Sequence, residues 1–178
     1  VMGHLFIAFL LLITSIFINQ NLVNYKLDRH INLWKIILSI PLSLTLIQSL
    51  IGVRLSSTWS AHLCLAFNKN CLILDSHKLF AIPLALSIFT IIGVSIFRKN
   101  LFINNWKYLL SMLLLLIAQI ILGVLSLQTN LNHPLIIVSH EIIASLLIAI
   151  LSTLIFGNSY SENSEGKSSK SNLLIGLN

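Results

Sequence analysis

Long stretches of apolar residues alternate with short polar segments along the chain. Five of these stretches approach or exceed the roughly 20 apolar residues that a helix needs to cross a bilayer. They are Val1–Ile18, Trp34–Val53, Leu72–Phe97, Trp106–Leu127 and Pro134–Phe156. No segment shows the alternation of period two that is typical of membrane-spanning strands. The pattern therefore predicts an all-α integral membrane protein with five transmembrane helices that contact the lipid bilayer directly.

Composition agrees with this prediction. Of the 178 residues, 56% are hydrophobic and only 9% are charged, whereas a soluble domain has about 25% charged residues. The mean hydropathy is +0.93. These values exclude a soluble globular domain, a disordered chain and a collagen-like chain. The net charge of +6 does not indicate a nucleic-acid partner, because the basic residues lie in short loops where they report membrane topology.

The distribution of Lys and Arg orients the helices. Eight of the 11 basic residues fall in segments 19–35, 98–107 and 157–178, which lie on one side of the membrane. The positive-inside rule assigns this side to the cytoplasm or its equivalent. The N-terminus and the segments 54–71 and 128–133 are then outside. The tail 157–178 is rich in Ser, Asn and charge, and we expect it to be flexible.

Both cysteines, Cys64 and Cys71, lie in the outward segment 54–71. An oxidising outer compartment would allow them to form a disulfide. The alternative is that they are two unpaired small hydrophobic residues. A metal site is less favoured, because only His62 lies close by and no fourth ligand is evident.

An internal repeat organises the last four expected helices. Residues 46–53 (LIQSLIGV) resemble residues 117–124 (IAQIILGV), and in both Gln is followed four residues later by Gly-Val near the outer end of a helix. The repeat predicts that residues 34–156 form a pseudo-twofold four-helix bundle made of two helical hairpins.

A second repeat concerns the first expected helix. His4-x-x-x-Ala8-x-Leu-Leu matches His140-x-x-x-Ala144-x-Leu-Leu. Residues 1–19 therefore look like the last helix of an earlier four-helix repeat, joined to the bundle by an inner loop at 20–33. Together with the start at Val1, this makes us expect the C-terminal part of an eight-helix protein. A different start codon or a trimmed chain would also explain Val1.

Three of the six histidines, His4, His77 and His140, lie within apolar stretches. Ionisable residues at membrane depth are energetically costly and indicate function by default. The others are expected to be solvated or interfacial; they are His30, His62 and His133.

His77 and His140 lie at matched depths, each roughly 5–10 Å below the outer interface at about 1.5 Å per helical residue. Because the repeat relates their helices, the two rings are predicted to face each other and to bind one haem iron in the bundle core. The alternative is a pair of hydrogen-bonded interhelical histidines. Lys78 and Arg54 lie at the outer side, where they would contact haem propionates or anchor their helices. Glu141 points about 100° away from His140, so it is not expected to support that ligand directly.

In order along the chain, these motifs resemble the haem A synthases, membrane proteins built from two four-helix repeats. The matching features are Gln48-x-x-x-Gly52-Val53-Arg54, Cys64 and Cys71, His77-Lys78, Gln119-x-x-x-Gly123, Pro134-Leu135 and His140-x-x-x-Ala144-x-Leu146-Leu147. The resemblance covers about residues 1–156. It implies an oxidoreductase that converts a methyl group of haem O into the formyl group of haem A, for cytochrome oxidase.

The resemblance also implies a cofactor, partners and a location. The cofactor is haem b, the substrate and product are haem O and haem A, and haem O synthase or oxidase-assembly proteins are the expected partners. The membrane is the bacterial plasma membrane or the mitochondrial inner membrane, with the haem side and the disulfide facing outside.

Carried over residue by residue, the resemblance assigns His77 and His140 as the axial ligands of haem b. Arg54 and Lys78 become propionate contacts, and His4 becomes one histidine of a second haem site for the substrate. The cysteine pair of the outer loop in the second repeat is matched by Cys64 and Cys71.

Two departures limit the transfer. The acidic residue of the family belongs to the first repeat, three positions before a haem histidine, and the corresponding place in this repeat holds Leu74. Lys78 stands where Arg is more usual. The chain is therefore expected to hold the haem b half and part of the substrate site, with no catalytic residue assigned. The alternative function is a non-catalytic b-type haem-binding membrane protein that transfers electrons.

Overall fold

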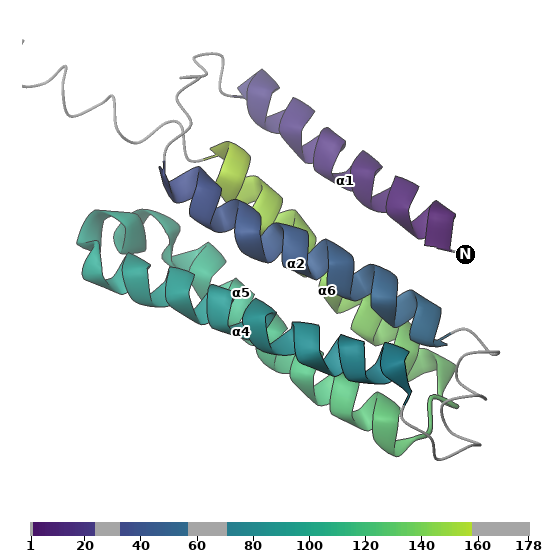
Figure 1. Ribbon diagram of the computed structural model, residues 1–178. Helices are drawn as coiled ribbons and strands as arrows, with labels where there is room; N and C mark the ends of the chain where they lie inside the picture. The colour runs from purple at the N-terminus through teal and green to yellow at the C-terminus, as the bar shows by residue number, and fades with distance from the viewer. Residues whose placement is uncertain (1, 24–32, 57–70, 158–178) are drawn as a thin grey trace, which may run out of the picture.

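The computed structural model describes residues 2–23, 33–56 and 71–157, and these residues form helices joined by short turns (Figure 1). The helices are α1 (Met2–Val23), α2 (Leu33–Ser56), α4 (Leu72–Phe97), α5 (Lys99–Gln128) and α6 (Pro134–Gly157). All five are long and apolar enough to cross a membrane. At about 1.5 Å per residue, even the 22 residues of α1 exceed the hydrocarbon thickness of about 30 Å. The expected all-α integral membrane fold is confirmed.

The helix boundaries follow the apolar stretches, with one clear exception. The loop expected over residues 98–107 is wrong, because α4 ends at Phe97 and α5 begins at Lys99. Arg98 alone reverses the chain, with φ −101° and ψ 84°, outside the helical region. The polar residues that follow it continue as helix, since a helix can extend beyond the hydrocarbon core. For the same reason α1 runs to Val23, four residues into the inner loop expected at 20–33.

Four helices form a closed ring in the order α2, α4, α5, α6, and α6 closes the ring by packing on α2. Consecutive helices in the ring run antiparallel (Figure 1). α1 lies outside the ring against α6 and α2. Its Phe17 packs edge-to-face on Phe156 of α6, with ring centroids 5.1 Å apart. The bundle thus consists of an α2–α4 hairpin followed by an α5–α6 hairpin, which is the arrangement that the repeat predicts.

Several hydroxyl groups within the bundle donate hydrogen bonds to carbonyls of their own helices. Thr45 Oγ1 donates to the carbonyl of Pro41 at 2.7 Å, and Ser95 Oγ donates to the carbonyl of Ile91 at 2.7 Å. Hydrocarbon offers no water to such groups, so polar atoms must find partners inside the protein. Small hydroxyl residues therefore fit into the interior of an apolar bundle.

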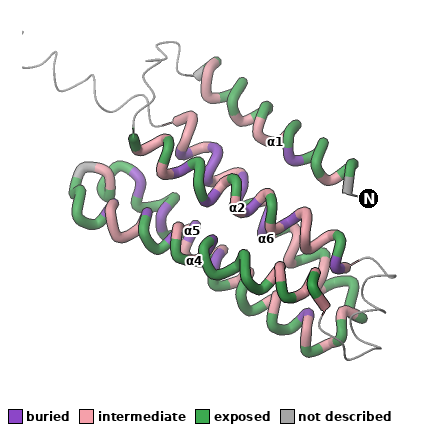
Figure 2. Tube along the Cα trace, viewed as in Figure 1, coloured by how far each residue is buried: buried purple, intermediate pink, exposed green. Residues whose placement is uncertain are grey.

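An aliphatic core fills the bundle, and all four ring helices contribute to it. Its buried members are Leu38, Leu84, Ile88, Ile91, Leu109, Met112, Leu116, Leu147, Leu151 and Leu154. Figure 2 shows these inward faces as buried and the outward faces as exposed. The outward faces carry large apolar side chains such as Ile82 and Leu86. In water such a surface would be unusual, but here it faces lipid.

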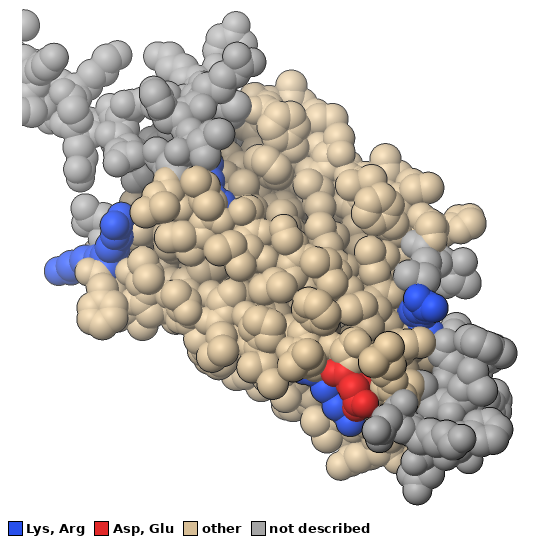
Figure 3. Space-filling view, in the orientation of Figure 1, with Lys and Arg blue, Asp and Glu red and all other residues tan. Residues whose placement is uncertain are grey.

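On the face that Figure 3 shows, the charged side chains of the described residues lie toward the two ends of the bundle, with an uncharged belt between them. The end where α2 begins and α4 meets α5 carries Lys35, Arg98 and Lys99. The opposite end carries Arg54 and Lys78. This separation is the one that a bilayer imposes, because charged side chains are costly in hydrocarbon.

Candidate functional site

A cavity of about 300 Å³ lies inside the ring, at the end where α2 and α5 finish and α4 and α6 begin. All four ring helices line it, and none of the lining residues comes from α1. The inner end of the cavity is bounded by the aliphatic core, because Leu84, Leu116 and Leu147 belong to both the cavity lining and the core. Small-molecule sites typically have volumes of about 300–1,000 Å³. The bundle is therefore packed over half its length and hollow over the other half.

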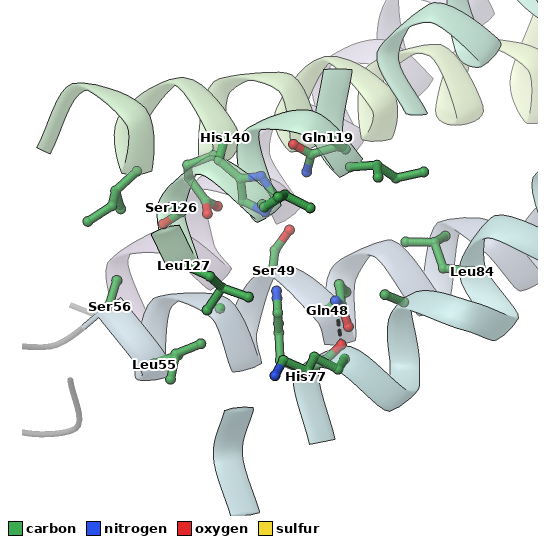
Figure 4. Close-up of a pocket in the computed structure, with 18 of the residues that line it drawn as sticks. Gln48, Ser49, Leu55, Ser56, His77, Leu84, Gln119, Ser126, Leu127 and His140 are labelled. Carbon is green, nitrogen blue, oxygen red and sulfur yellow. Dashed lines mark hydrogen bonds between the residues drawn. The ribbon is translucent and has the colours of Figure 1, made fainter. Parts of the chain in front are cut away.

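His77 of α4 and His140 of α6 enter this cavity from diagonally opposite helices and point toward one another (Figure 4). Their ring centroids are 6.4 Å apart, and the ring planes are inclined by 58°. A direct hydrogen bond requires nitrogens within about 3.2 Å, and a ring nitrogen lies only about 1 Å from its centroid. The two histidines are thus too far apart to form a hydrogen bond with each other. The alternative of a directly hydrogen-bonded histidine pair is therefore excluded in this structure.

Each histidine ring lies against a glycine of the neighbouring helix. A Cβ at Gly52 would lie 3.2 Å from Cε1 of His77, and a Cβ at Gly123 would lie 3.4 Å from Cε1 of His140. The glycines therefore let α2 and α5 approach the rings closely. The Gln-x-x-x-Gly repeat contained this signal, but sequence reasoning gave the glycines no role in the site.

The glutamines of the repeat also belong to the cavity wall. Gln48 Nε2 donates to the backbone carbonyl of His77 at 2.8 Å, so α2 braces α4 next to the ring (Figure 4). The Oε1 atoms of Gln48 and Gln119 are buried, and neither has a hydrogen-bond partner among the described residues. These two carbonyl oxygens are polar groups at the edge of the cavity that a bound group can satisfy.

The Nδ1 atoms of His77 and His140 are buried, and neither makes a hydrogen bond of ordinary geometry within the described part of the chain. The backbone of Gln48 nevertheless lies close to the His77 ring, and that of Gln119 lies close to the His140 ring. A metal-bound histidine usually directs its second nitrogen toward a backbone carbonyl, a carboxylate or water. The backbone of Gln48 or Gln119 lies beside each ring where such a partner would be, but neither Nδ1 forms that hydrogen bond among the described residues.

The other residues expected in the site fall into two groups. Lys78 lines the cavity and is exposed. Arg54 lies in the last turn of α2 at the same end of the bundle, but it does not line the cavity. His4 is exposed on α1, and His133 is exposed beside the α5–α6 turn; neither lines the cavity. The expected second haem site at His4 stays a prediction.

The cysteine prediction involves a residue outside the described ranges. Cys71 directly precedes α4, whereas Cys64, like His30 and His62, lies outside the residues that the structure describes. The disulfide between Cys64 and Cys71 therefore stays a prediction.

Two residues that the sequence analysis did not place in the site, Glu141 and Leu74, line the cavity. Glu141 lines the cavity, and its buried Oε1 has no hydrogen-bond partner in the described ranges. Sequence reasoning set Glu141 aside because it points away from His140, but the cavity is wide enough that neighbouring residues of α6 both reach it. Leu74 also lines the wall. The place that the resemblance aligns with the acid of that family's first repeat is therefore a cavity position here, occupied by an apolar side chain.

The donor set of the site restricts what it can hold. Within residues 2–23, 33–56 and 71–157, no group of three or more His, Cys, Asp or Glu could bind a bare metal ion. Two imidazoles bonded at about 2 Å to opposite sides of one metal place their centroids roughly 6 Å apart, and the observed distance is 6.4 Å. The remaining ligands must then come from the bound group itself, as they do in haem. These residues fit a haem with two axial histidines.

Comparisons with protein-family models, with curated proteins and with solved structures find no match to this chain. Its function must therefore be inferred from the geometry and chemistry of the cavity.

Proposed function

We propose that the four-helix bundle binds one haem b, with His77 and His140 as its axial ligands. The observation that carries this proposal is the 6.4 Å separation of two facing imidazoles in an apolar cavity. Two further features support it. The described residues offer no third metal ligand, and each ring is seated against a glycine that lets the next helix approach it.

The protein's own residues orient the group and exclude water from it. Leu84, Leu116 and Leu147 close the inner end of the cavity with apolar surface. Lys78 lines the cavity from the second turn of α4, where it can pair with an anionic propionate. Arg54 is the second basic residue at this end. Haem bound in this way supplies one-electron redox chemistry to the protein.

We further propose a particular enzyme class, namely an oxidoreductase of the haem A synthase type, of which this bundle is the haem b half. The order and spacing of the sequence motifs support this assignment. The substrate and product would be haem O and haem A, and haem O synthase or oxidase-assembly proteins would be its partners. The excess of Lys and Arg at the other end of the bundle supports an orientation with the haem side outward, in a bacterial plasma membrane or the mitochondrial inner membrane.

A second candidate is a non-catalytic haem protein that transfers electrons. One observation favours it: Leu74 is apolar in the cavity wall, so this repeat has no acid at the place that corresponds to the first-repeat acid of the enzyme family. The two candidate functions differ in whether haem A is formed. The enzyme converts haem O into haem A when given a reductant and oxygen, whereas an electron carrier leaves haem O unchanged, as chromatography of the extracted haems would show.

The haem site itself is tested by replacing its ligands. His77→Ala and His140→Ala should each abolish the low-spin spectrum of a bis-histidine haem in the purified protein, because each removes one axial ligand. His133→Ala is the matched control, since His133 is exposed and does not line the cavity. If both ligand variants keep the haem content and spectrum of the wild type, the axial assignment is wrong.

A further inference from the structure

The wall of the cavity differs from side to side. Between α2 and α6 three of its lining residues are inaccessible: Thr45 is 2% exposed, Ser49 is 6% exposed and Leu147 is fully buried. α1 packs on these same two helices from outside. On this side, two layers of protein separate the cavity from the exterior: the ring helices α2 and α6, and then α1.

The opposite side, between α4 and α5, is open. Ala81 of α4 and Ile120 and Val124 of α5 line the cavity and are nevertheless exposed, Ile120 by 53% and Val124 by 50%. A side chain that both lines a cavity and faces the exterior lies at its rim. Ala81 and Ala85 lie one turn apart on α4, and both line the cavity with small side chains.

The depth of this opening decides what it faces. Ala81 lies nine residues after the start of α4 at Leu72, which is about 14 Å along the helix at about 1.5 Å per residue. At that depth a membrane-spanning helix is surrounded by hydrocarbon chains. The cavity therefore opens sideways into the bilayer interior as well as toward the helix end.

We propose that this lateral opening, with Ala81, Ile120 and Val124 as its rim, is the route by which the tetrapyrrole enters the cavity from the bilayer. The proposal rests on the haem site proposed above. A haem-like macrocycle has a flat apolar body with anionic groups along one edge. The opening matches that shape, because its rim is apolar while Lys78, one turn closer to the helix end on α4, also lines the cavity and supplies a cation.

The test measures how fast the apoprotein takes up haem b from lipid. Apoprotein reconstituted in phosphatidylcholine vesicles is mixed with donor vesicles that contain haem b, and the Soret absorbance is followed with time. Ile120→Trp should slow uptake roughly tenfold by obstructing the rim, and Ile120→Ala should accelerate it. Ile121 provides the matched control, because it is the neighbouring residue of the same type, is also 53% exposed and does not line the cavity.

The outcomes separate the route from the site. Slower uptake by Ile120→Trp and faster uptake by Ile120→Ala, with Ile121→Trp and Ile121→Ala at the wild-type rate, support the route. Equal rates for all variants, with a normal final amplitude, overturn the route and leave the haem site intact. A wild-type protein that never acquires the bis-histidine spectrum overturns both. If Ile120→Trp loses binding altogether, the comparison of Ile120→Ala with Ile121→Ala decides, and equal rates overturn the route.

Discussion

Gly52 of α2 lies directly against the imidazole of His77 on α4, so that a Cβ at residue 52 would be 3.2 Å from the ring. The pseudo-twofold counterparts, Gly123 and His140, repeat this relationship at 3.4 Å. Each half of the bundle thus uses a glycine to seat a histidine ring from the neighbouring helix. This contact restricts how far each ring can move toward the neighbouring helix.

This relationship predicts how the glycines affect binding. Gly52→Ala should weaken haem b binding about tenfold, because the new methyl group displaces the His77 ring by a few tenths of an ångström. Gly123→Ala should have a smaller effect, since 3.4 Å is closer to ordinary van der Waals contact. The measurement is the Kd from a haem titration monitored at the Soret band.

The control for the glycine experiment is Gly93→Ala, because nothing lies within 4 Å of a Cβ at that position. It shares the change in helix propensity with the other two variants but not the contact with a ring. Equal haem affinities for Gly52→Ala and Gly93→Ala would contradict the seating role.

The hydrogen bond from Gln48 to the backbone of His77 gives a second prediction. Gln48→Leu removes the Nε2 donor that lies 2.8 Å from the backbone carbonyl oxygen of His77, so this carbonyl loses the hydrogen bond from α2. A hydrogen bond of this kind contributes about 0.5–1.5 kcal/mol to stability. The variant should retain haem but release it several-fold faster, as measured by transfer to apomyoglobin, with a shifted reduction potential because the ligand is less well positioned.

Gln128→Leu is the control for that variant, since Gln128 is the exposed last residue of α5 and does not line the cavity. If the two variants release haem at the same rate and share the wild-type potential, Gln48 does not position the ligand.

The sequence predicts that the chain has five membrane-spanning helices and that His77 and His140 face each other. The bounds of α4, Leu72–Phe97, agree with the expected stretch, because polar Asn70 and charged Arg98 lie close to its two ends in the sequence. The repeat relates the helices of His77 and His140, and the structure places both rings in one cavity. An internal repeat places corresponding residues of the two hairpins at equivalent positions around the bundle. This is why His77 and His140 could be expected to face each other.

Other features could not be read from the sequence. The start of α5 at Lys99 was missed because hydropathy marks the hydrocarbon-embedded part of a helix, and the helix extends beyond it. The position of Glu141 in the wall and the lateral opening at Ile120 depend on how the helices are rotated about their axes. In a membrane protein, both the inward and the outward faces are apolar, so the pattern does not fix that rotation.

The cysteines give a third prediction. Cys64 and Cys71 share an expected outward segment, so we expect them to form a disulfide in the oxidising compartment. Alkylation of the denatured protein without reductant should leave both thiols unlabelled in intact-mass analysis. Prior reduction is the positive control and should add two labels. Two labels without reduction would rule out the bond.

The last prediction concerns His4. This histidine is exposed on α1, outside the helical ring, and it does not line the cavity that contains His77 and His140. A haem iron has two axial positions, and we propose that those two histidines occupy both. His4→Ala should therefore leave the haem b content, the low-spin spectrum and the Kd unchanged.

The informative comparison for His4 is His140→Ala, because the two histidines occupy matching places in the repeated motif. His4→Ala should leave the haem titration unchanged, whereas His140→Ala should remove the bis-histidine spectrum. Loss of this spectrum in His4→Ala would mean that α1 contributes to the same site, contrary to its position outside the ring. A second haem, if titration of the wild type reveals one, should be weakened by His4→Ala alone, since a site at α1 lies apart from the cavity of the bundle.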